Sequence, residues 1–269
     1  MSDIVTCEVR DHVADVRLNR PDKMNAVNHE MWQALGGIGE VLAAESGVRA
    51  VVLSGNGRAF CSGLDMASFQ AMSGGGPGAP GGQALDAGRD RPENFFQRAA
   101  LVWKRIPVPV IAALHGVAYG AGAQIALGAD IRFAAPDLRL SILEIKWGLI
   151  PDVGITQTLR NLVPLDVAKE LTFTGRVLDA EAARALGLVT HVVEDAHAGA
   201  MALAREIAGK SPDAIRAGKR LLDEAWHADE RTGLALEAAL QRTLIGSPNQ
   251  VESIRANFEK RAPDFADPD

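Results

Sequence analysis

Two carboxylates lie eight positions apart in a largely apolar stretch, residues 143–154. They belong to Glu144 and Asp152. Apolar surroundings raise the pKa of a carboxyl group, and a second carboxylate nearby raises it further. Such a pair can take a proton from a substrate and return one. For this segment taken alone, the more common arrangement is a salt-bridged Glu144 and an Asp152 that caps the start of a helix.

Two glycine-containing turns could hold a negative charge. Residues 59–65 read Ala-Phe-Cys-Ser-Gly-Leu-Asp after an apolar run, and residues 115–124 lead into Gly120-Ala121-Gly122. The first N–H groups of a helix have no partner within it, and the helix dipole adds positive potential there. Backbone N–H groups of both turns could therefore bind an anionic oxygen. Ordinary strand-to-helix turns and close helix packing explain the same glycines.

Two further motifs fit less well. The pattern Gly120-x-Gly122-x-x-Ala126 has the form of a dinucleotide-binding fingerprint. The helix expected there is too short, because a new strand begins soon after Asp130 and leaves no room for a βαβ crossover. A serine hydrolase is disfavoured because Ser62 lies outside any Gly-x-Ser-x-Gly sequence.

Composition and charge exclude several classes of protein. The chain has 269 residues, of which 47% are hydrophobic and 23% charged, as in soluble globular proteins. A net charge of −6 argues against a sequence-independent nucleic-acid binder. The only cysteines, Cys7 and Cys61, form no zinc or disulfide pattern. We find no signal peptide and no apolar run of about 18 residues, so we expect a cytoplasmic protein without a metal or a membrane anchor.

The elements that would position these residues are short strands and helices of an α/β fold. The apolar spacing predicts a hairpin over residues 4–9 and 13–18, and a helix over His29–Ala44. Further strands are expected at residues 50–53, 110–114, 131–134, 138–142 and 188–193. Further helices are expected at residues 95–106, 120–127, 156–162, 165–173, 180–186, 198–208, 212–226, 233–245 and 250–258. A glycine- and proline-rich loop is expected at residues 73–82. We expect a β/α core over residues 1–200 and a helical region over residues 201–269.

The motifs together resemble those of the enoyl-CoA hydratase/isomerase (crotonase) superfamily, in order and spacing, over nearly the whole chain. The two turns and the carboxylate segment match, as do four further stretches: residues 18–26, 173–176, 185–189 and 258–263. The resemblance implies a spiral of ββα turns with a helical C-terminal trimerisation region. It also implies a homotrimer or a homohexamer built from two trimers.

The same resemblance implies an enzyme that binds acyl-CoA as its substrate, needs no cofactor, and stabilises an enolate of the thioester. By position, the oxyanion hole consists of the backbone N–H groups of Ser62 and Ala121. Two fixed donors of this kind accelerate a reaction without reorganising, and each is typically worth about 10²–10³ in rate.

Coenzyme A contacts are also implied by position. Lys23, Asn25 and Ala26 match the turn that surrounds the adenine in the family. Lys260 matches a C-terminal lysine that reaches the CoA phosphates, often from a neighbouring subunit. For both lysines the alternative is an ordinary solvated surface charge. Arg20 has no role assigned from the sequence.

The acid and base positions depart from the hydratase pattern. Gln124 stands where hydratases have their first glutamate, and Glu144 matches the second. An amide can hold a water molecule but cannot exchange a proton. Asp152 matches an aspartate of dienoyl-CoA isomerases. We therefore expect double-bond isomerisation of an enoyl- or dienoyl-CoA, with Glu144 as the base and Asp152 as its partner.

Three alternatives remain open at this stage. The first is an enoyl-CoA hydratase that uses Glu144 with a water held by Gln124. The second is a non-catalytic member of the family that binds acyl-CoA. The third is a dehalogenase-like relative in which an aspartate near position 152 attacks a thioester substrate as nucleophile.

Overall fold

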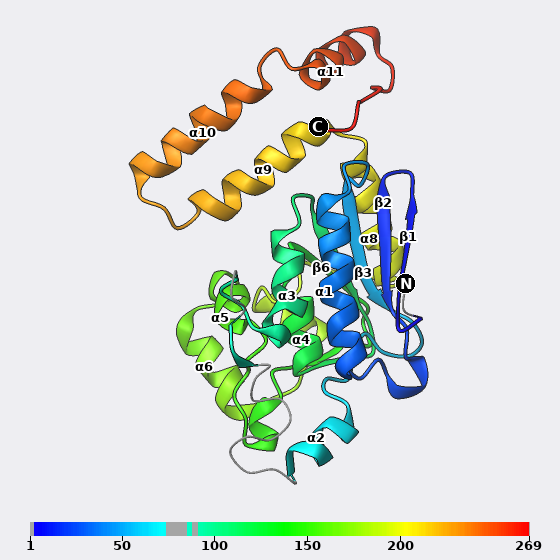
Figure 1. Ribbon diagram of the computed structural model, residues 1–269, viewed down its shortest axis with the longest axis vertical. Coiled ribbons are helices and arrows are strands. Elements are labelled where there is room, and N and C mark those ends of the chain that lie inside the picture. The colour runs from blue at the N-terminus through cyan, green and yellow to red at the C-terminus, as the bar shows by residue number, and fades with distance from the viewer. Residues whose placement is uncertain (1–2, 74–84, 88–90, 269) are drawn as a thin grey trace.

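The computed structural model describes residues 3–73, 85–87 and 91–268. The loop predicted at residues 73–82 falls outside these ranges apart from Ser73, which ends a helix. Within these ranges the main sheet has six strands in the order β1-β2-β3-β4-β6-β9 (Figure 1). These strands are β1 (Val5–Arg10), β2 (Val13–Leu18), β3 (Ala50–Gly55), β4 (Val110–Leu114), β6 (Ile131–Ala134) and β9 (His191–Val192).

The pairing in this sheet is mixed. β1 and β2 form the predicted antiparallel hairpin, and every later neighbour in the sheet pairs in parallel. Asp11 and His12 join the hairpin with positive φ angles of 48° and 64°, as a two-residue hairpin turn requires. A smaller sheet contains β5 (Val117–Tyr119), β7 (Arg139–Ser141) and β8 (Leu178–Asp179) in the order β5-β7-β8.

Helices cover both faces of the main sheet, which confirms the predicted α/β class. Alternate residues of β3 face opposite sides: Val51 and Leu53 pack in one apolar cluster with residues of α1 (His29–Ala44) and α3 (Phe95–Arg105). Ala50 and Val52 pack in a second cluster against α8 (Ala196–Ala208). Helix α8 presents a small residue at every fourth position, namely Ala196, Ala200, Ala204 and Ala208. This row of alanines lets α8 lie close to the sheet.

The predicted strands and long helices are present with shifted ends. The predicted helix at residues 156–162 is a short α5 (Ile155–Thr158) followed by a 3₁₀ turn, Leu159–Asn161. Other predicted helices are α4 (Ala121–Ala126), α6 (Leu165–Thr174) and α7 (Ala180–Ala185). Five short elements among the described residues were not predicted: α2 (Met66–Ser73), β5, β8 and the 3₁₀ turns Pro21–Lys23 and Glu144–Trp147. Short elements like these carry too few residues for an apolar period to stand out.

A helical extension leaves the core after α8. It consists of α9 (Pro212–Ala225), α10 (Glu230–Leu244) and α11 (Pro248–Glu259), which lie beyond one end of the sheet (Figure 1). The boundary predicted after residue 200 cuts through α8, which packs on the sheet along its length. The change from core to extension therefore lies at residues 209–211. Among the described residues, no helix combines the length and the apolar character that a membrane span needs.

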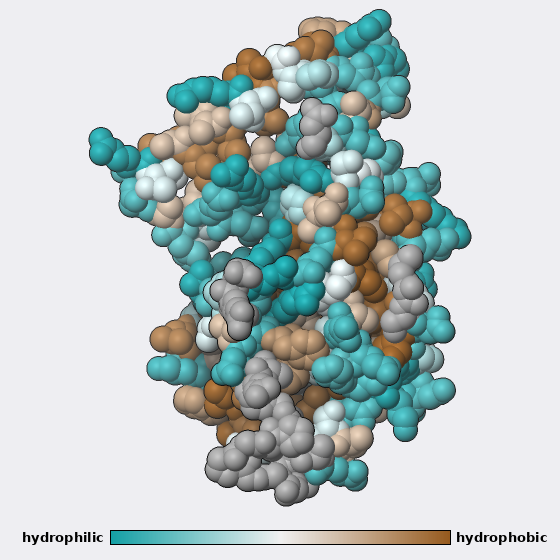
Figure 2. All heavy atoms as spheres, in the orientation of Figure 1, coloured by the Kyte–Doolittle hydropathy of each residue, from teal (hydrophilic) through white to brown (hydrophobic). Residues whose placement is uncertain are grey.

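The extension exposes much apolar surface. Figure 2 shows hydrophobic residues gathered on its visible face. None of the residues of α10 is buried, and α9 buries only Pro212. The large exposed side chains on the extension are Leu222, Trp226, Leu234, Ile245, Val251, Ile254 and Phe258. A surface of this kind is typical of a region that contacts another protein chain.

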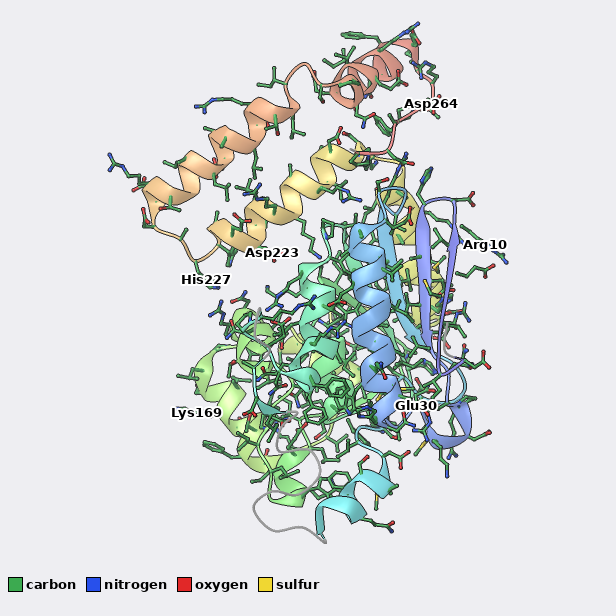
Figure 3. The ribbon with its side chains drawn as sticks, in the orientation of Figure 1. Arg10, Glu30, Lys169, Asp223, His227 and Asp264 are labelled. Carbon is green, nitrogen blue, oxygen red and sulfur yellow. The ribbon has the colours of Figure 1, made fainter. Side chains whose placement is uncertain are left out.

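Two ion pairs join α9 to the core. Lys219 is 8% exposed in its side chain, and its Nζ lies 2.7 Å from Oδ2 of Asp130. Nζ also donates to the carbonyl of Val108 at 3.0 Å. On the core-facing side of α9, Asp223 lies 3.5 Å from Nζ of Lys104 (Figure 3). The buried Lys219–Asp130 pair therefore anchors the first helix of the extension.

We expect Lys219→Met to destabilise the protein by about 3–5 kcal/mol, because it leaves the Asp130 carboxylate inside the protein without its cation. Thermal unfolding followed by circular dichroism measures the loss. The matched control is Lys210→Met, which breaks an exposed pair with Glu206 at 3.8 Å and should change little. Equal effects of the two substitutions would contradict this role for Lys219.

Candidate active site

The two glycine-containing turns lie side by side. Cys61 and Ala118 form a parallel bridge. The N–H of Cys61 donates to the carbonyl of Val117, and the N–H of Tyr119 donates to the carbonyl of Cys61, both at 3.0 Å. The structure therefore brings together two segments that are more than 50 residues apart in the sequence.

Gly122 makes this close approach possible. A Cβ atom at this position would lie 2.5 Å from the carbonyl oxygen of Cys61 and 2.8 Å from its Sγ. Because both neighbours are fixed parts of the core, any larger residue would separate the two turns. Gly63 has a φ of +96°, which favours glycine, and its missing side chain leaves room for the carbonyl of Tyr119.

The prediction that the Ser62 amide is a free donor is wrong. The N–H of Ser62 donates to the carbonyl of Met24 at 2.9 Å. The free amide on this segment is that of Leu64, which has no hydrogen-bond acceptor among the described residues. Val27 pairs with the carbonyl of Gly63 and the N–H of Asp65, so the N–H of Leu64 faces away from Val27. The unpaired amide of this predicted turn is therefore that of Leu64 and not that of Ser62.

Ala121 is the first residue of α4, as predicted. Its N–H has no acceptor within the helix or among the other described residues. The preceding Gly120 has a φ of +51°, and its N–H donates to the carbonyl of Ser141 at 2.9 Å. The two unpaired amides of Leu64 and Ala121 therefore flank the point where the two turns meet.

Glu144 reaches the same region through Gln124 of α4. Nε2 of Gln124 donates to Oε1 of Glu144 at 2.6 Å, and Oε1 of Gln124 accepts from the N–H of Val153 at 2.8 Å. Gln124 is fully buried and held from both ends. A Cβ atom on Gly120 would lie 3.2 Å from Oε1 of Glu144, so the carboxylate stands directly beside the start of α4.

The second oxygen of the Glu144 carboxylate, Oε2, is buried and accepts no hydrogen bond from a described residue. Burial raises the pKa of Glu144, and the charge of Asp152 raises it further. The Asp152 carboxyl also has a raised pKa, because the surrounding chain removes water from it, although the residue as a whole is exposed. Neighbouring carboxylates with raised pKa values are typical of proton-transfer sites.

The common arrangement for such a segment, a salt-bridged Glu144 and an Asp152 that caps a helix, is not present among the described residues. Glu144 is bonded to an amide and forms no salt bridge within the described part of the chain. Asp152 caps no helix, because α5 begins after Gly154 and has no side-chain cap. No described group of three or more His, Cys, Asp or Glu side chains could hold a metal ion.

The turn predicted to contact coenzyme A is present, but its residues differ in what they can do. Lys23 is exposed at the end of a 3₁₀ turn, Pro21–Lys23. The Asn25 side chain is fully buried and donates to the carbonyls of Asn56 and Ala59 at 2.9 and 2.8 Å. Its amide therefore stabilises the turn and is not available to a ligand. Ala26 is also buried, and its carbonyl accepts from the guanidinium of Arg20.

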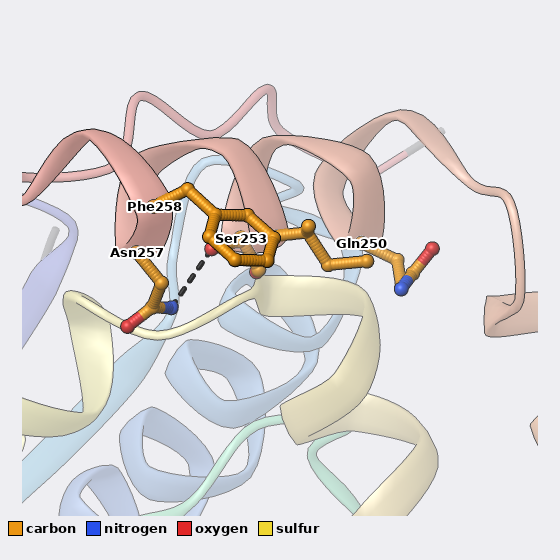
Figure 4. A pocket seen from close by; sticks show the side chains of 5 residues that line it. Gln250, Ser253, Asn257 and Phe258 are labelled. Atoms are coloured by element: carbon orange, nitrogen blue, oxygen red, sulfur yellow. Dashed lines mark hydrogen bonds between the residues drawn. The ribbon is translucent and has the colours of Figure 1, made fainter.

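Lys260 is exposed at the C-terminal end of α11. In Figure 1, α11 lies at the opposite end of the molecule from α2 and the turn that contains Lys23. A surface hollow on α11 is lined by Gln250, Ser253, Ile254, Asn257 and Phe258 (Figure 4). This hollow contains no carboxylate and is remote from Glu144. One chain therefore does not bring Lys260 to the candidate site.

Two aromatic side chains lie next to the site. Phe69 of α2 and Trp147 of the 3₁₀ turn stack with ring centroids 4.4 Å apart. Trp147 is 43% exposed, so it is not a core residue. The stack joins the segment that follows Leu64 to the segment that begins with Glu144.

Comparison with known proteins agrees with this geometry. The family model described as enoyl-CoA hydratase/isomerase matches residues 8–268. The chain belongs to the enoyl-CoA hydratase/isomerase family. Mouse mitochondrial Delta(3,5)-Delta(2,4)-dienoyl-CoA isomerase is 34% identical over 266 residues, which cover 96% of this chain and 80% of the relative. Mouse mitochondrial methylglutaconyl-CoA hydratase is 32% identical over 258 residues, which cover 92% and 77%.

The fold of the family is also seen in solved structures. The crystal structure of enoyl-CoA hydratase from Mycobacterium tuberculosis matches with a TM-score of 0.84 and 31% identity, and covers 98% of this chain and 99% of that one. The predicted crotonase fold and the prediction of an enzyme of this family are confirmed. Relatives named as isomerase and as hydratase are almost equally similar, so identity alone does not separate the two reactions. Cytoplasmic location stays a prediction.

We expect Glu144→Gln to raise the stability of the protein at neutral pH while it lowers activity by about 10²–10⁴. Because the folded-state pKa of Glu144 is raised, its carboxyl contributes most to stability below the ordinary value of 4.5 and loses that contribution as pH rises. A glutamine keeps the hydrogen bond from Gln124 and removes the buried charge. Thermal unfolding midpoints measured across pH check this expectation.

The gain should shrink as pH falls through the raised folded-state pKa and be lost well below 4.5, where the wild-type carboxyl is protonated in both states. The matched control is Glu194→Gln, which neutralises an exposed glutamate and should shift the midpoint little at any pH. A variant that is less stable than wild type at neutral pH would refute the assignment of a buried, charged Glu144.

Proposed function

We propose that this enzyme moves a double bond in an enoyl-CoA or dienoyl-CoA thioester by taking a proton from one carbon and returning one to another. The observation that carries the proposal is the Glu144 carboxylate: one oxygen is held by Gln124, and the other is buried without a partner next to Asp152. An unpaired carboxylate oxygen in an apolar site is a competent base once a substrate proton lies within reach.

In the proposed reaction, the backbone N–H groups of Leu64 and Ala121 bind the carbonyl oxygen of the thioester. Glu144 removes a proton from the acyl chain, and the electron pair moves onto that oxygen as an enolate or its extended dienolate. The two N–H groups stabilise the oxyanion because they are fixed in place before the charge forms. The electron pair then returns from the oxygen, and a carbon further along the chain takes a proton from Asp152, which enters the cycle protonated. Glu144 then releases its proton to solvent and Asp152 takes one up, so both carboxyls return to their starting states.

Gln124 favours isomerisation over hydration. Its amide has no proton to exchange, and both of its ends are occupied by Glu144 and Val153. Hydration by a two-glutamate route would need an acid at this position. Asp152 is the nearest second carboxyl to Glu144 and supplies the proton that Gln124 cannot. No cofactor enters any step of the proposal.

We also propose that the enzyme works as a homotrimer or homohexamer. The exposed apolar residues of α9, α10 and α11 suit contact with a second copy. Lys260 would then reach the coenzyme A of a neighbouring subunit, while Lys23 would contact it from the same chain. Both lysines carry a mobile point charge of the kind that binds phosphate.

The direct test compares two substrates, crotonyl-CoA and a 3,5-dienoyl-CoA. We expect fast isomerisation of the dienoyl substrate and slow hydration of crotonyl-CoA. Asp152→Asn and Glu144→Gln should each lower the isomerisation rate by about 10²–10⁴. Fast hydration of crotonyl-CoA that is unaffected by Asp152→Asn would establish the hydratase alternative. Binding of acyl-CoA without turnover of either compound would identify a non-catalytic member.

The oxyanion donors can be tested by replacing single peptide bonds with esters. Incorporation of the 2-hydroxy analogue of leucine at position 64 replaces the N–H of that residue with an oxygen, and it also weakens the Gly63 carbonyl as an acceptor from Val27. We expect kcat to fall by about 10²–10³ with the fold intact. The matched control is the corresponding ester at Ser62, which removes the bond to Met24 and costs about 0.5–1.5 kcal/mol of stability. Its kcat should change only a few-fold, and the reverse ranking would reassign the donor to Ser62.

A further inference from the structure

Arg20 connects the coenzyme A turn to the segment that carries the Leu64 amide. Its Nη1 donates to Oδ2 of Asp65 at 2.8 Å and to the carbonyl of Ala26. The side chains of Arg20 and Asp65 are only 19% and 16% exposed. This partly buried pair lies between segments that are 45 positions apart in the sequence.

Asp65 also contacts helix α2. Its other oxygen, Oδ1, accepts from the N–H of Ala67 in the first turn of the helix at 3.0 Å. The carboxylate is thus held by a cation on one side and a helix N–H on the other. These two contacts keep its pKa below the ordinary value, with the Ala67 bond as the larger cause.

Leu64 lies between two residues that this network fixes. The carbonyl of Gly63 accepts from Val27 at 2.8 Å, and the N–H of Asp65 donates to Val27 at 3.0 Å. Arg20 holds Ala26, next to Val27, and Asp65 at the same time. The direction of the Leu64 N–H therefore depends on the two backbone hydrogen bonds to Val27. Arg20 contacts the chain on both sides of these bonds, at Ala26 and at Asp65.

We propose that Arg20 is a positioning residue, which orients the Leu64 N–H by clamping Asp65 to the carbonyl of Ala26. This inference rests on the proposed role of Leu64 as an oxyanion donor. Arg20 acts without contact with the reacting atoms, so its loss reduces kcat and leaves KM nearly unchanged. The planar guanidinium suits the task because it offers several donors in fixed directions, whereas lysine offers a single point charge.

The experiment measures kcat and KM for Arg20→Met, Arg20→Lys and Asp65→Asn with the substrate that the wild-type enzyme turns over. We expect Arg20→Met to lower kcat about tenfold or more, with KM within about threefold, and Arg20→Lys to recover part of the loss. The double variant of Arg20→Met and Asp65→Asn should be no slower than the worse single variant, because both substitutions weaken the same Arg20–Asp65 contact. The matched control, Arg17→Met, breaks the Arg17–Asp15 pair on β2 and should leave kcat unchanged.

Hydrogen–deuterium exchange of the native enzyme supplies a readout that does not depend on activity. Peptides that cover residues 62–69 should exchange faster in Arg20→Met and Asp65→Asn than in wild type, and at the wild-type rate in Glu144→Gln. A normal kcat in folded Arg20→Met, or a loss confined to KM, would overturn the proposal. If Arg20→Met does not fold, the kinetics and the hydrogen–deuterium exchange of Arg20→Lys and Asp65→Asn test the proposal instead. Failure of the wild-type enzyme on both thioesters would refute the proposed function instead, and the exchange rates would still report on the clamp.

Discussion

The parallel pairing of Cys61 with Ala118 is the contact on which the candidate site depends. It brings the turn before α2, which carries Leu64, against the segment that leads into Ala121 at the start of α4. The pairing is possible only because Gly122 has no side chain to meet the Cys61 carbonyl. Burial also raises the pKa of the Cys61 thiol to about 12, so this residue stays a neutral packing element beside the site.

The site must also tolerate a carboxylate in apolar surroundings. Gln124 meets this demand by donating one hydrogen bond to Glu144 and accepting one from Val153, so it adds no charge of its own. A glutamate in the same place would set two carboxylates about 2.6 Å apart, and one of them would have to hold a proton. With an amide at this position, the proton transfer that we propose falls to the Glu144–Asp152 pair.

The sequence predicts the segments of this site better than their atoms. The apolar run around residues 50–53 and the helix spacing of residues 29–44 locate β3 and α1, because both elements are long enough to show their period. The amide that faces the site could not be predicted in the same way. Whether Ser62 or Leu64 is free depends on how residues 24–27 pair with residues 62–65, and that pairing joins parts of the chain that are distant in the sequence.

The partners of the Asn25 and Arg20 side chains could not be predicted from the sequence either. A polar asparagine in a ligand-binding turn suggests a ligand contact, yet its amide is used to hold Asn56 and Ala59. An arginine in a surface turn suggests a solvated charge, yet it bridges Asp65 and Ala26. In both cases the side chain satisfies backbone or carboxylate groups that the fold has buried, and most buried groups of that kind have a partner. The turn at residues 21–26 and the segment around Leu64 are therefore held in place by the same side chains.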